Sequence, residues 1–283
     1  MDLLRIEDLN KTQILDIFSL TDKLKKSNRS NILRGKDFVL FFPESSLRTR
    51  ISFEKGIKNL GGNCILFPPE TLDKKESLYD VGKYIENWAE GIIVRHPDLS
   101  KLEQLSKDTA IPVINAMTTE NHPCEIITDL YSISKLKKDY QELVYTFVGV
   151  ANNISRSWMN IARVMDLKLN HVCVNGNRFT PDNDNYSFTT DLENTLYCSD
   201  IVLTDSLPDK YSNQEYIKKY QITLKRMGLA NKNALLNPCP PFFRGEEVSK
   251  DVIASDYFVG HLFKKNLIYV QQAIIAYCLG LSI

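Results

Sequence analysis

The segment DFVLFFPESSLRTRISFE, residues 37–54, joins a continuous apolar run to a polar and basic stretch. Its first six residues have the length and composition of a strand buried on both faces. A helix is predicted to follow directly, because Ser45 and Ser46 are good N-caps and Gly61 and Gly62 supply a stop. A buried strand that leads straight into a helix is typical of an α/β fold.

The same alternation of strand and helix continues along the rest of the chain. Helical spacing of apolar residues predicts helices at 76–90, 99–105 and 124–136. Between and after them we predict strands at CILF (64–67), GIIVR (91–95), PVINAM (112–117), LVYTFVGV (143–150), HVCVNG (171–176), IVLTD (201–205) and ALLNPC (234–239). The predicted fold class is α/β, with two doubly wound domains of parallel strands joined by helical crossovers.

The most polar break between the two similar halves is KKDYQ, residues 137–141. We therefore predict a first domain over 1–137 and a second over 138–283. The final apolar run is predicted to be a helix, 262–283, that packs back on the first domain.

The amino-acid composition argues against proteins that bind nucleic acid or a membrane. Lysine and arginine number 35, and aspartate and glutamate also number 35, so no global field favours nucleic acid or an anionic membrane. The longest apolar stretches, near 274–281, are too short to span a bilayer, and we expect a cytoplasmic protein. The six cysteines form no CxxC pair and are expected to be reduced core residues, not a disulfide frame or a zinc site.

The junction at residues 43–54 has the features of a phosphate site. A helix N-terminus offers free N–H groups and a positive dipole, the hydroxyls of Ser46 and Thr49 add donors, and the Arg48 guanidinium can grip phosphate oxygens. The alternative is a capped surface helix with solvated arginines. Positive charge in a first turn opposes the helix dipole, which favours an anionic ligand.

This segment resembles the Ser-Thr-Arg-Thr-Arg signature of the aspartate and ornithine carbamoyltransferase family, which binds carbamoyl phosphate. The resemblance covers nearly the whole chain. The family's order of motifs continues through VRHP (94–97), HPCE (122–125), VGVANNISRS (148–157), TDSLP (204–208) and NPCPPFFRGEEV (237–248). It implies transfer of a carbamoyl group to an amine with release of phosphate, without a cofactor or a metal.

The resemblance also implies roles for residues of the first half. Three of them, Arg48, Arg95 and His122, are the expected catalytic residues: Arg48 steadies the leaving phosphate, Arg95 contacts phosphate and the carbamoyl oxygen, and His122 polarises the carbonyl. The expected carbamoyl phosphate site also includes Ser46, Leu47, Thr49, Glu125 and Lys75. For His122 taken alone, a satisfied loop histidine would be the simpler interpretation.

Two of these positions depart from the family pattern. Leu47 stands where the family has threonine, so one hydroxyl donor is lost. Glu125 stands where the family has glutamine, and a carboxylate accepts hydrogen bonds but would repel phosphate. A structural alternative is that Glu125 complements the helix N-terminus.

Lys74 and Lys75 resemble the family's mobile loop, whose lysine reaches the active site of a neighbouring subunit, and Lys75 fits the ornithine-type pattern better. The implied assembly is a homotrimer with active sites at subunit interfaces. For the lysine that is not used, a solvated surface loop is the simpler interpretation.

The second-substrate site is expected to include Arg156, for an α-carboxylate, and Asp205, for an ammonium group. Ser206 replaces the arginine with which aspartate-type members bind the side-chain carboxylate. The family's HCLP segment appears as NPCP, so Asn237 replaces its histidine, Cys239 lies one position from its cysteine, and Pro240 is expected to be its cis proline. Cys239 and Pro240 complete the expected site.

The predicted function is a carbamoyltransferase acting on ornithine or a related diamino acid. Aspartate as acceptor, or a non-catalytic regulatory member, are the alternatives that remain open. A nucleotide-binding dehydrogenase is excluded because no GxGxxG or GxxxxGK[ST] motif is present.

Overall fold

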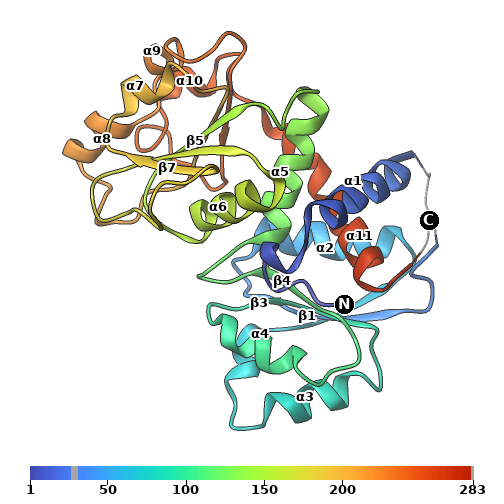
Figure 1. Cartoon of the computed structure of the whole chain (residues 1–283). Helices are drawn as coiled ribbons and strands as arrows, with labels where there is room; N and C mark the ends of the chain where they lie inside the picture. The colour runs from blue at the N-terminus through green and yellow to red at the C-terminus, as the bar shows by residue number, and fades with distance from the viewer. Residues whose placement is uncertain (27–30, 282–283) are drawn as a thin grey trace. The chain divides into compact units, whose positions relative to one another are not determined.

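The computed structural model describes residues 1–26 and 31–281. Its internal contacts divide the chain into two compact units, Met1–Lys135 with Lys264–Ile283 and Leu136–Phe263 (Figure 1). The predicted boundary, after residue 137, lies a little beyond this division. Residues 282 and 283, the end of the predicted final helix, lie outside the described residues.

The first unit is built on a parallel four-stranded sheet in the order β2-β1-β3-β4. Apart from residues at their ends, β1, β3 and β4 are buried, whereas the residues of the edge strand β2 are exposed or half-buried. The strands are β1 (Asp37–Phe41), β2 (Asn63–Phe67), β3 (Gly91–Arg95) and β4 (Val113–Met117). The chain runs from β1 outward to β2 and then crosses to β3 on the other side of β1. Ligands of open α/β sheets bind where the winding reverses in this way, at the carboxyl ends of the strands.

Helices cover the buried strands β1, β3 and β4 of this sheet, which are largely apolar on both faces. They are η1 (Ile6–Asp8), α1 (Lys11–Lys26), α2 (Leu47–Asn59), η2 (Pro69–Asp73), α3 (Leu78–Ile85), α4 (Leu99–Ser106), α5 (Pro123–Leu136), η3 (His261–Lys265) and α11 (Asn266–Cys278). Leucines of α3 and α4 pack on one face, against Val39, Phe41, Ile92, Val94 and Val113.

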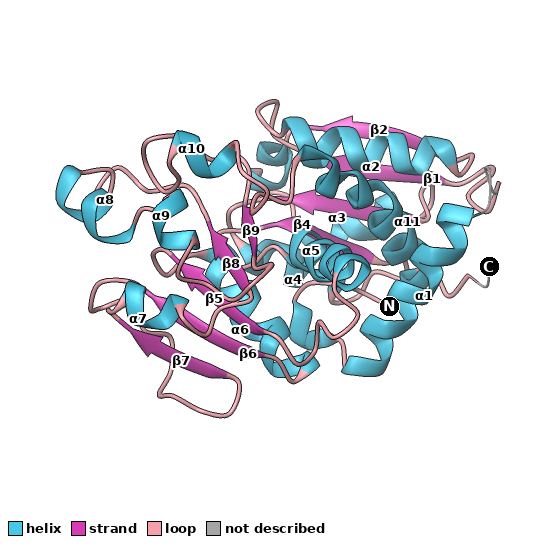
Figure 2. Cartoon of the chain, turned by 90° about the horizontal axis from the view of Figure 1, so that it is seen from above, coloured by secondary structure: helices cyan, strands magenta, loops and turns pink. Residues whose placement is uncertain are grey.

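The final helix belongs to the first unit, as predicted. Helix α11 packs against α1 and α2 (Figures 1 and 2). The Gln272 side chain of α11 donates a hydrogen bond to the Gly56 carbonyl of α2 at 2.7 Å. Glycine at residue 56 suits this contact, because a Cβ atom there would already touch Gln272 and Ile268.

The second unit has a parallel five-stranded sheet in the order β7-β6-β5-β8-β9, and its winding reverses between β5 and β8. Its strands are β5 (Val144–Val148), β6 (Lys168–Val172), β7 (Tyr186–Thr189), β8 (Ile201–Thr204) and β9 (Leu235–Pro238). Its helices are α6 (Asn153–Met165), α7 (Leu192–Leu196), α8 (Gln214–Tyr220), α9 (Leu224–Met227) and α10 (Lys250–Ile253). The predicted fold class is confirmed.

Two strands differ from the prediction. Strand β6 begins at Lys168, three residues before the predicted start, and β7 was not predicted at all. Both strands alternate buried and more exposed residues, so they lack the continuous apolar run that marked the central strands. Among residues 1–26 and 31–281, no helix is long and apolar enough to cross a membrane.

Candidate active site

An arginine and two hydroxyls meet where the winding of the first sheet reverses. Ser46 is the N-cap residue of α2, yet its side chain makes no capping hydrogen bond. Its Oγ instead accepts a hydrogen bond from Arg95 Nη1, at the end of β3, at 3.0 Å, and Thr49 Oγ1 accepts from the same nitrogen at 3.3 Å. Ser46 and Thr49 are buried, with 2% and 4% of their surface exposed. The hydroxyls therefore hold the Arg95 guanidinium beside the N-terminus of α2.

The first turn of α2 carries positive charge and no acidic residue. The Arg48 side chain is exposed, and the Leu47 side chain, at the first position of the helix, is 63% exposed. Arg50 lies near Glu54 instead, with Nε 2.6 Å from Oε1. A helix N-terminus with added cations and a serine that does not cap it favours a bound anion over the capped surface helix.

His122 lies between β4 and α5, at the carboxyl edge of the same sheet. A turn precedes it, in which Thr118 N donates to the Asn121 carbonyl at 2.9 Å. The His122 side chain is 5% exposed, and burial, opposed by Glu125 and aided by Arg95, lowers its pKa to about 4. At neutral pH the ring is therefore uncharged, and one of its nitrogens carries a proton that it can donate.

Glu125 is buried in the first turn of α5, three residues after His122. Its Oε1 lies 2.6 Å from Lys264 Nζ. Sequence reasoning did not identify Lys264 as a site residue. The two positions are 139 residues apart, and no local pattern connects them.

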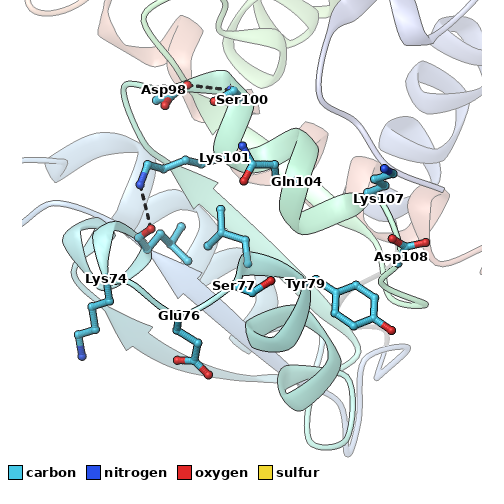
Figure 3. Close-up of a pocket in the computed structure, with 12 residues that line it drawn as sticks. Lys74, Glu76, Ser77, Tyr79, Asp98, Ser100, Lys101, Gln104, Lys107 and Asp108 are labelled. Carbon is cyan, nitrogen blue, oxygen red and sulfur yellow. Dashed lines mark hydrogen bonds between the residues drawn. The ribbon is translucent and has the colours of Figure 1, made fainter.

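The loop with Lys74 and Lys75 is exposed, and its base is anchored by Asp73. The Asp73 carboxylate contacts His96 Nε2 at 3.1 Å and Lys101 Nζ at 2.6 Å. Lys74, but not Lys75, lines a pocket of about 420 Å³ between this loop and α4 (Figure 3).

The pocket differs in character from the Ser46–Arg95 cluster. Lysines line it together with carboxylates, among them Glu76, Asp98 and Asp108. In Figure 3 the Lys74 side chain extends away from α4. The pocket contains none of the residues expected to bind carbamoyl phosphate, and its mixed charges do not favour a phosphate group.

In the second unit, Asn152 and Asp205 meet where the winding reverses between β5 and β8. Asn152 caps α6, since its Oδ1 accepts from Ser155 N at 2.9 Å, and the Ser155 hydroxyl accepts from Asn152 N at 2.8 Å. Asn152 Nδ2 also donates to Asp205 Oδ2 at 2.8 Å. Ser206 follows at a half-buried position. Asn152 was not among the predicted site residues, although its N-x-x-S capping spacing is readable in the sequence.

The other predicted residues of this unit are placed separately. The exposed Arg156 guanidinium lies over the Phe179 ring, 4.9 Å from its centroid. Cys239 is buried after β9, and its N–H donates to the Thr204 carbonyl at 2.8 Å. Pro240 is half-buried.

The cis peptide bond joins Pro240 to Pro241, so the expectation that Pro240 itself is the cis proline is wrong by one residue.

Glu247 is a further buried carboxylate that sequence reasoning missed. It is 3% exposed, and its Oε1 accepts from Phe243 N at 2.5 Å. Burial, with smaller contributions from Glu246 and Asp205, raises its pKa to about 7. Glu247 and Asp205 therefore interact electrostatically.

Comparisons with known proteins cover both units. Residues 1–135 match the family model described as "Aspartate/ornithine carbamoyltransferase, carbamoyl-P binding domain", and residues 141–278 match "Aspartate/ornithine carbamoyltransferase, Asp/Orn binding domain". The chain is 31% identical to an ornithine carbamoyltransferase of Methanococcus aeolicus, over 98% of this chain and 99% of the relative. It is 30% identical to that of Syntrophus aciditrophicus, over 97% and 98%. The crystal structure of ornithine carbamoyltransferase from Burkholderia thailandensis superposes with a TM-score of 0.90 at 26% identity, covering 98% of each chain.

Proposed function

The chain belongs to the aspartate/ornithine carbamoyltransferase family, and from this premise we propose that it transfers the carbamoyl group of carbamoyl phosphate to an amino group of ornithine. The observation that carries the proposal is the cluster of Ser46, Thr49 and Arg95 at the N-terminus of α2. It gathers the donors that a phosphate group requires, close to a buried neutral histidine. The proposal assigns residues 1–137 to carbamoyl phosphate and 138–283 to the second substrate, with the final helix returning to the first domain.

The proposed mechanism uses charge stabilisation by groups that are already in place. The first turn of α2 and Arg48 bind the phosphate, with Ser46, Thr49 and the backbone at Leu47 around it. The neutral amine attacks the carbamoyl carbon, and Arg95 and the His122 N–H stabilise the negative charge that grows on the carbonyl oxygen. The C–N bond forms, the C–O bond to phosphate breaks with its electron pair going to phosphate, and the amine's proton passes to the phosphate. Glu125 accepts a hydrogen bond from the carbamoyl NH2.

We propose ornithine as the acceptor because of the charged side chains in the second unit. Ornithine carries a second ammonium group, for which the proposal uses Asp205, held by Asn152. Arg156 takes the α-carboxylate, and Ser206, Cys239 and Pro240 complete the acceptor site. The Asp205 carboxylate, which also acts electrostatically on the buried Glu247, disfavours an acidic acceptor such as aspartate.

We propose a homotrimer in which Lys75 of one subunit completes the site of its neighbour. Both Lys74 and Lys75 are exposed on a loop whose base Asp73 fixes. The edge strand β2 supports an assembly, because it exposes the apolar side chains of Ile65 and Phe67, each at 43%. All six cysteines are free thiols, which fits the cytoplasm as the proposed compartment.

The deciding experiment measures release of phosphate from carbamoyl phosphate by the purified protein. Ornithine, aspartate, putrescine and 2,3-diaminopropionate are offered separately, and the carbamoylated product is identified by mass spectrometry. Turnover with ornithine alone is the expected result. Turnover only with another acceptor would replace ornithine by that acceptor. Absence of both turnover and carbamoyl phosphate binding would favour the non-catalytic alternative.

A further inference from the structure

Helix α5 buries two carboxylates one turn apart, and one lysine contacts both. Lys264 Nζ, from η3, lies 2.6 Å from Glu125 Oε1 and 2.6 Å from Asp129 Oδ1. The side chains of Glu125 and Asp129 are 7% and 1% exposed, and that of Lys264 is 19% exposed. Burying a carboxylate without a cationic partner is costly, so Lys264 is the group that lets α5 hold this pair.

The Glu125 carboxylate interacts electrostatically with residues of the proposed phosphate site, Arg48 and His122. Burial raises its pKa, but Lys264, His122 and Arg48 outweigh burial and hold the pKa below its ordinary value. Glu125 is therefore ionised at neutral pH and can only accept hydrogen bonds. Its charge faces Arg48 from α2 and the buried His122, the same groups that the proposed function assigns to carbamoyl phosphate.

The net charge of the groups around the proposed carbamoyl phosphate site depends on Lys264. Arg48, Arg95 and Lys264 provide three positive charges, and the two carboxylates of α5 provide two negative ones, while His122 is neutral. The sum is one positive charge. Removing Lys264 would bring it to zero and leave Glu125 to repel a phosphate dianion.

We propose that Lys264 is a positioning residue that makes a carboxylate acceptable beside the phosphate site. It fixes Glu125 Oε1 and cancels its charge, so that Oε2 accepts from the carbamoyl NH2 while the site stays net positive. Glu125 and Lys264 together thus replace the neutral glutamine that the resemblance implies at residue 125. This inference rests on the proposed binding of carbamoyl phosphate.

The test measures the Kd of carbamoyl phosphate by calorimetry for the full chain and for three variants. Lys264→Met should weaken binding at least about tenfold. Adding Glu125→Gln to Lys264→Met should restore the Kd to within about threefold of wild type. Adding Asp129→Asn instead is the matched control: it restores the same net charge one turn further along α5 but leaves the Glu125 charge beside His122 and Arg48, so it should restore binding clearly less than Glu125→Gln.

A pH profile separates this role from a purely structural one. In Lys264→Met, Glu125 remains near Arg48, His122 and Asp129 but loses its lysine, so its pKa should rise. As the pH falls from 8 to 6, the Kd of Lys264→Met for carbamoyl phosphate should therefore decrease relative to the Kd of the double variant Lys264→Met with Glu125→Gln. The two double variants have equal net charge, so their comparison stands even where Lys264→Met alone does not fold.

The outcomes are distinguishable. Equal rescue by Asp129→Asn and Glu125→Gln, or unchanged binding in a folded Lys264→Met, would overturn this inference alone, provided that wild type binds carbamoyl phosphate. Failure of wild type to bind carbamoyl phosphate would overturn the proposed function and this inference together.

Discussion

Two arginines of α2, two residues apart, have different surroundings. Arg48 lies in the first turn and is exposed, whereas Arg50 is 2.6 Å from Glu54 on the same helix. A surface pair of the second kind contributes at most about 1 kcal/mol to stability. The exposed guanidinium of Arg48 can instead donate hydrogen bonds to a ligand. The same residue type therefore has a proposed binding role at residue 48 and a minor structural role at residue 50.

Arg48→Ala should lower kcat/KM by at least about a hundredfold, because it removes a cation that stabilises the leaving phosphate. Steady-state kinetics with carbamoyl phosphate as the varied substrate measures the loss, and circular dichroism checks that the fold is intact. Arg50→Ala is the control and should stay within about threefold of wild type. Near-normal turnover of a folded Arg48→Ala variant would remove this arginine from the phosphate site.

Glu247 should make the stability of the protein depend on pH. Its carboxyl has an ordinary pKa of 4.5 and a folded pKa of about 7, so between these values the folded chain holds a proton that the unfolded chain releases. The contribution of Glu247 to the free energy of unfolding is therefore largest below pH 4.5. It decreases as the pH rises and is lost at about pH 7.

Glu247→Gln should consequently gain stability relative to wild type as the pH rises from 4.5 to 8, by about 1 to 3 kcal/mol. Urea denaturation at several pH values measures the difference. Glu246→Gln removes the same charge from the adjacent, less buried side chain and serves as the control. A wild-type-to-variant difference that does not change with pH would contradict the assignment.

At the scale of elements, both sheets place polar residues where a strand passes into a helix. In the second unit the capping box of Asn152 and Ser155 begins α6, and the same asparagine holds Asp205 at 2.8 Å. One side chain thus stabilises a helix and orients a proposed substrate ligand. These two effects can be separated by substitution.

Asn152→Ala removes both interactions and should cost about 1 kcal/mol of stability, whereas Asn152→Ser keeps a capping oxygen and should recover most of it. Both variants should raise the KM for ornithine, because Asp205 loses the amide that orients it. Thermal unfolding and kinetics together provide the measurement. A normal KM for ornithine in Asn152→Ser would show that the Asp205 contact has no role in binding.

At the scale of the whole molecule, the proposed homotrimer makes a prediction about mixed subunits. In a ring of three, each site would take Arg48 from one subunit and Lys75 from the next. Every mixed ring of Arg48→Ala and Lys75→Ala subunits then contains a single intact site.

Random mixing of the two inactive variants in equal amounts should therefore recover about one quarter of wild-type activity. Subunits are refolded together, mixed trimers are verified by mass, and phosphate release is measured. Mixing Arg48→Ala with a variant that carries both substitutions is the control and should recover none. Lack of recovery in verified mixed trimers would rule out a shared site.

Short sequence patterns by themselves predicted most of the strands of this protein and the position of its proposed phosphate site. Largely apolar runs such as GIIVR and PVINAM predict buried parallel strands, because a strand covered on both faces is apolar at most of its positions. The motif order placed Ser46, Thr49 and Arg95 in one predicted site, and the structure joins these three by hydrogen bonds. The half-buried strand β7 escaped prediction because its pattern is short and weak.

The tertiary structure alone decided which charges share a buried space. Lys264 meets Glu125 across 139 residues, and Glu247 acquires a raised pKa from burial among segments that are not adjacent in sequence. The physical reason is that periodicity and capping act over a few residues, whereas desolvation and Coulomb interaction depend on distance in the folded chain. Sequence thus predicts the elements and the position of each motif, and packing fixes the electrostatic character of the groups that those motifs bring together.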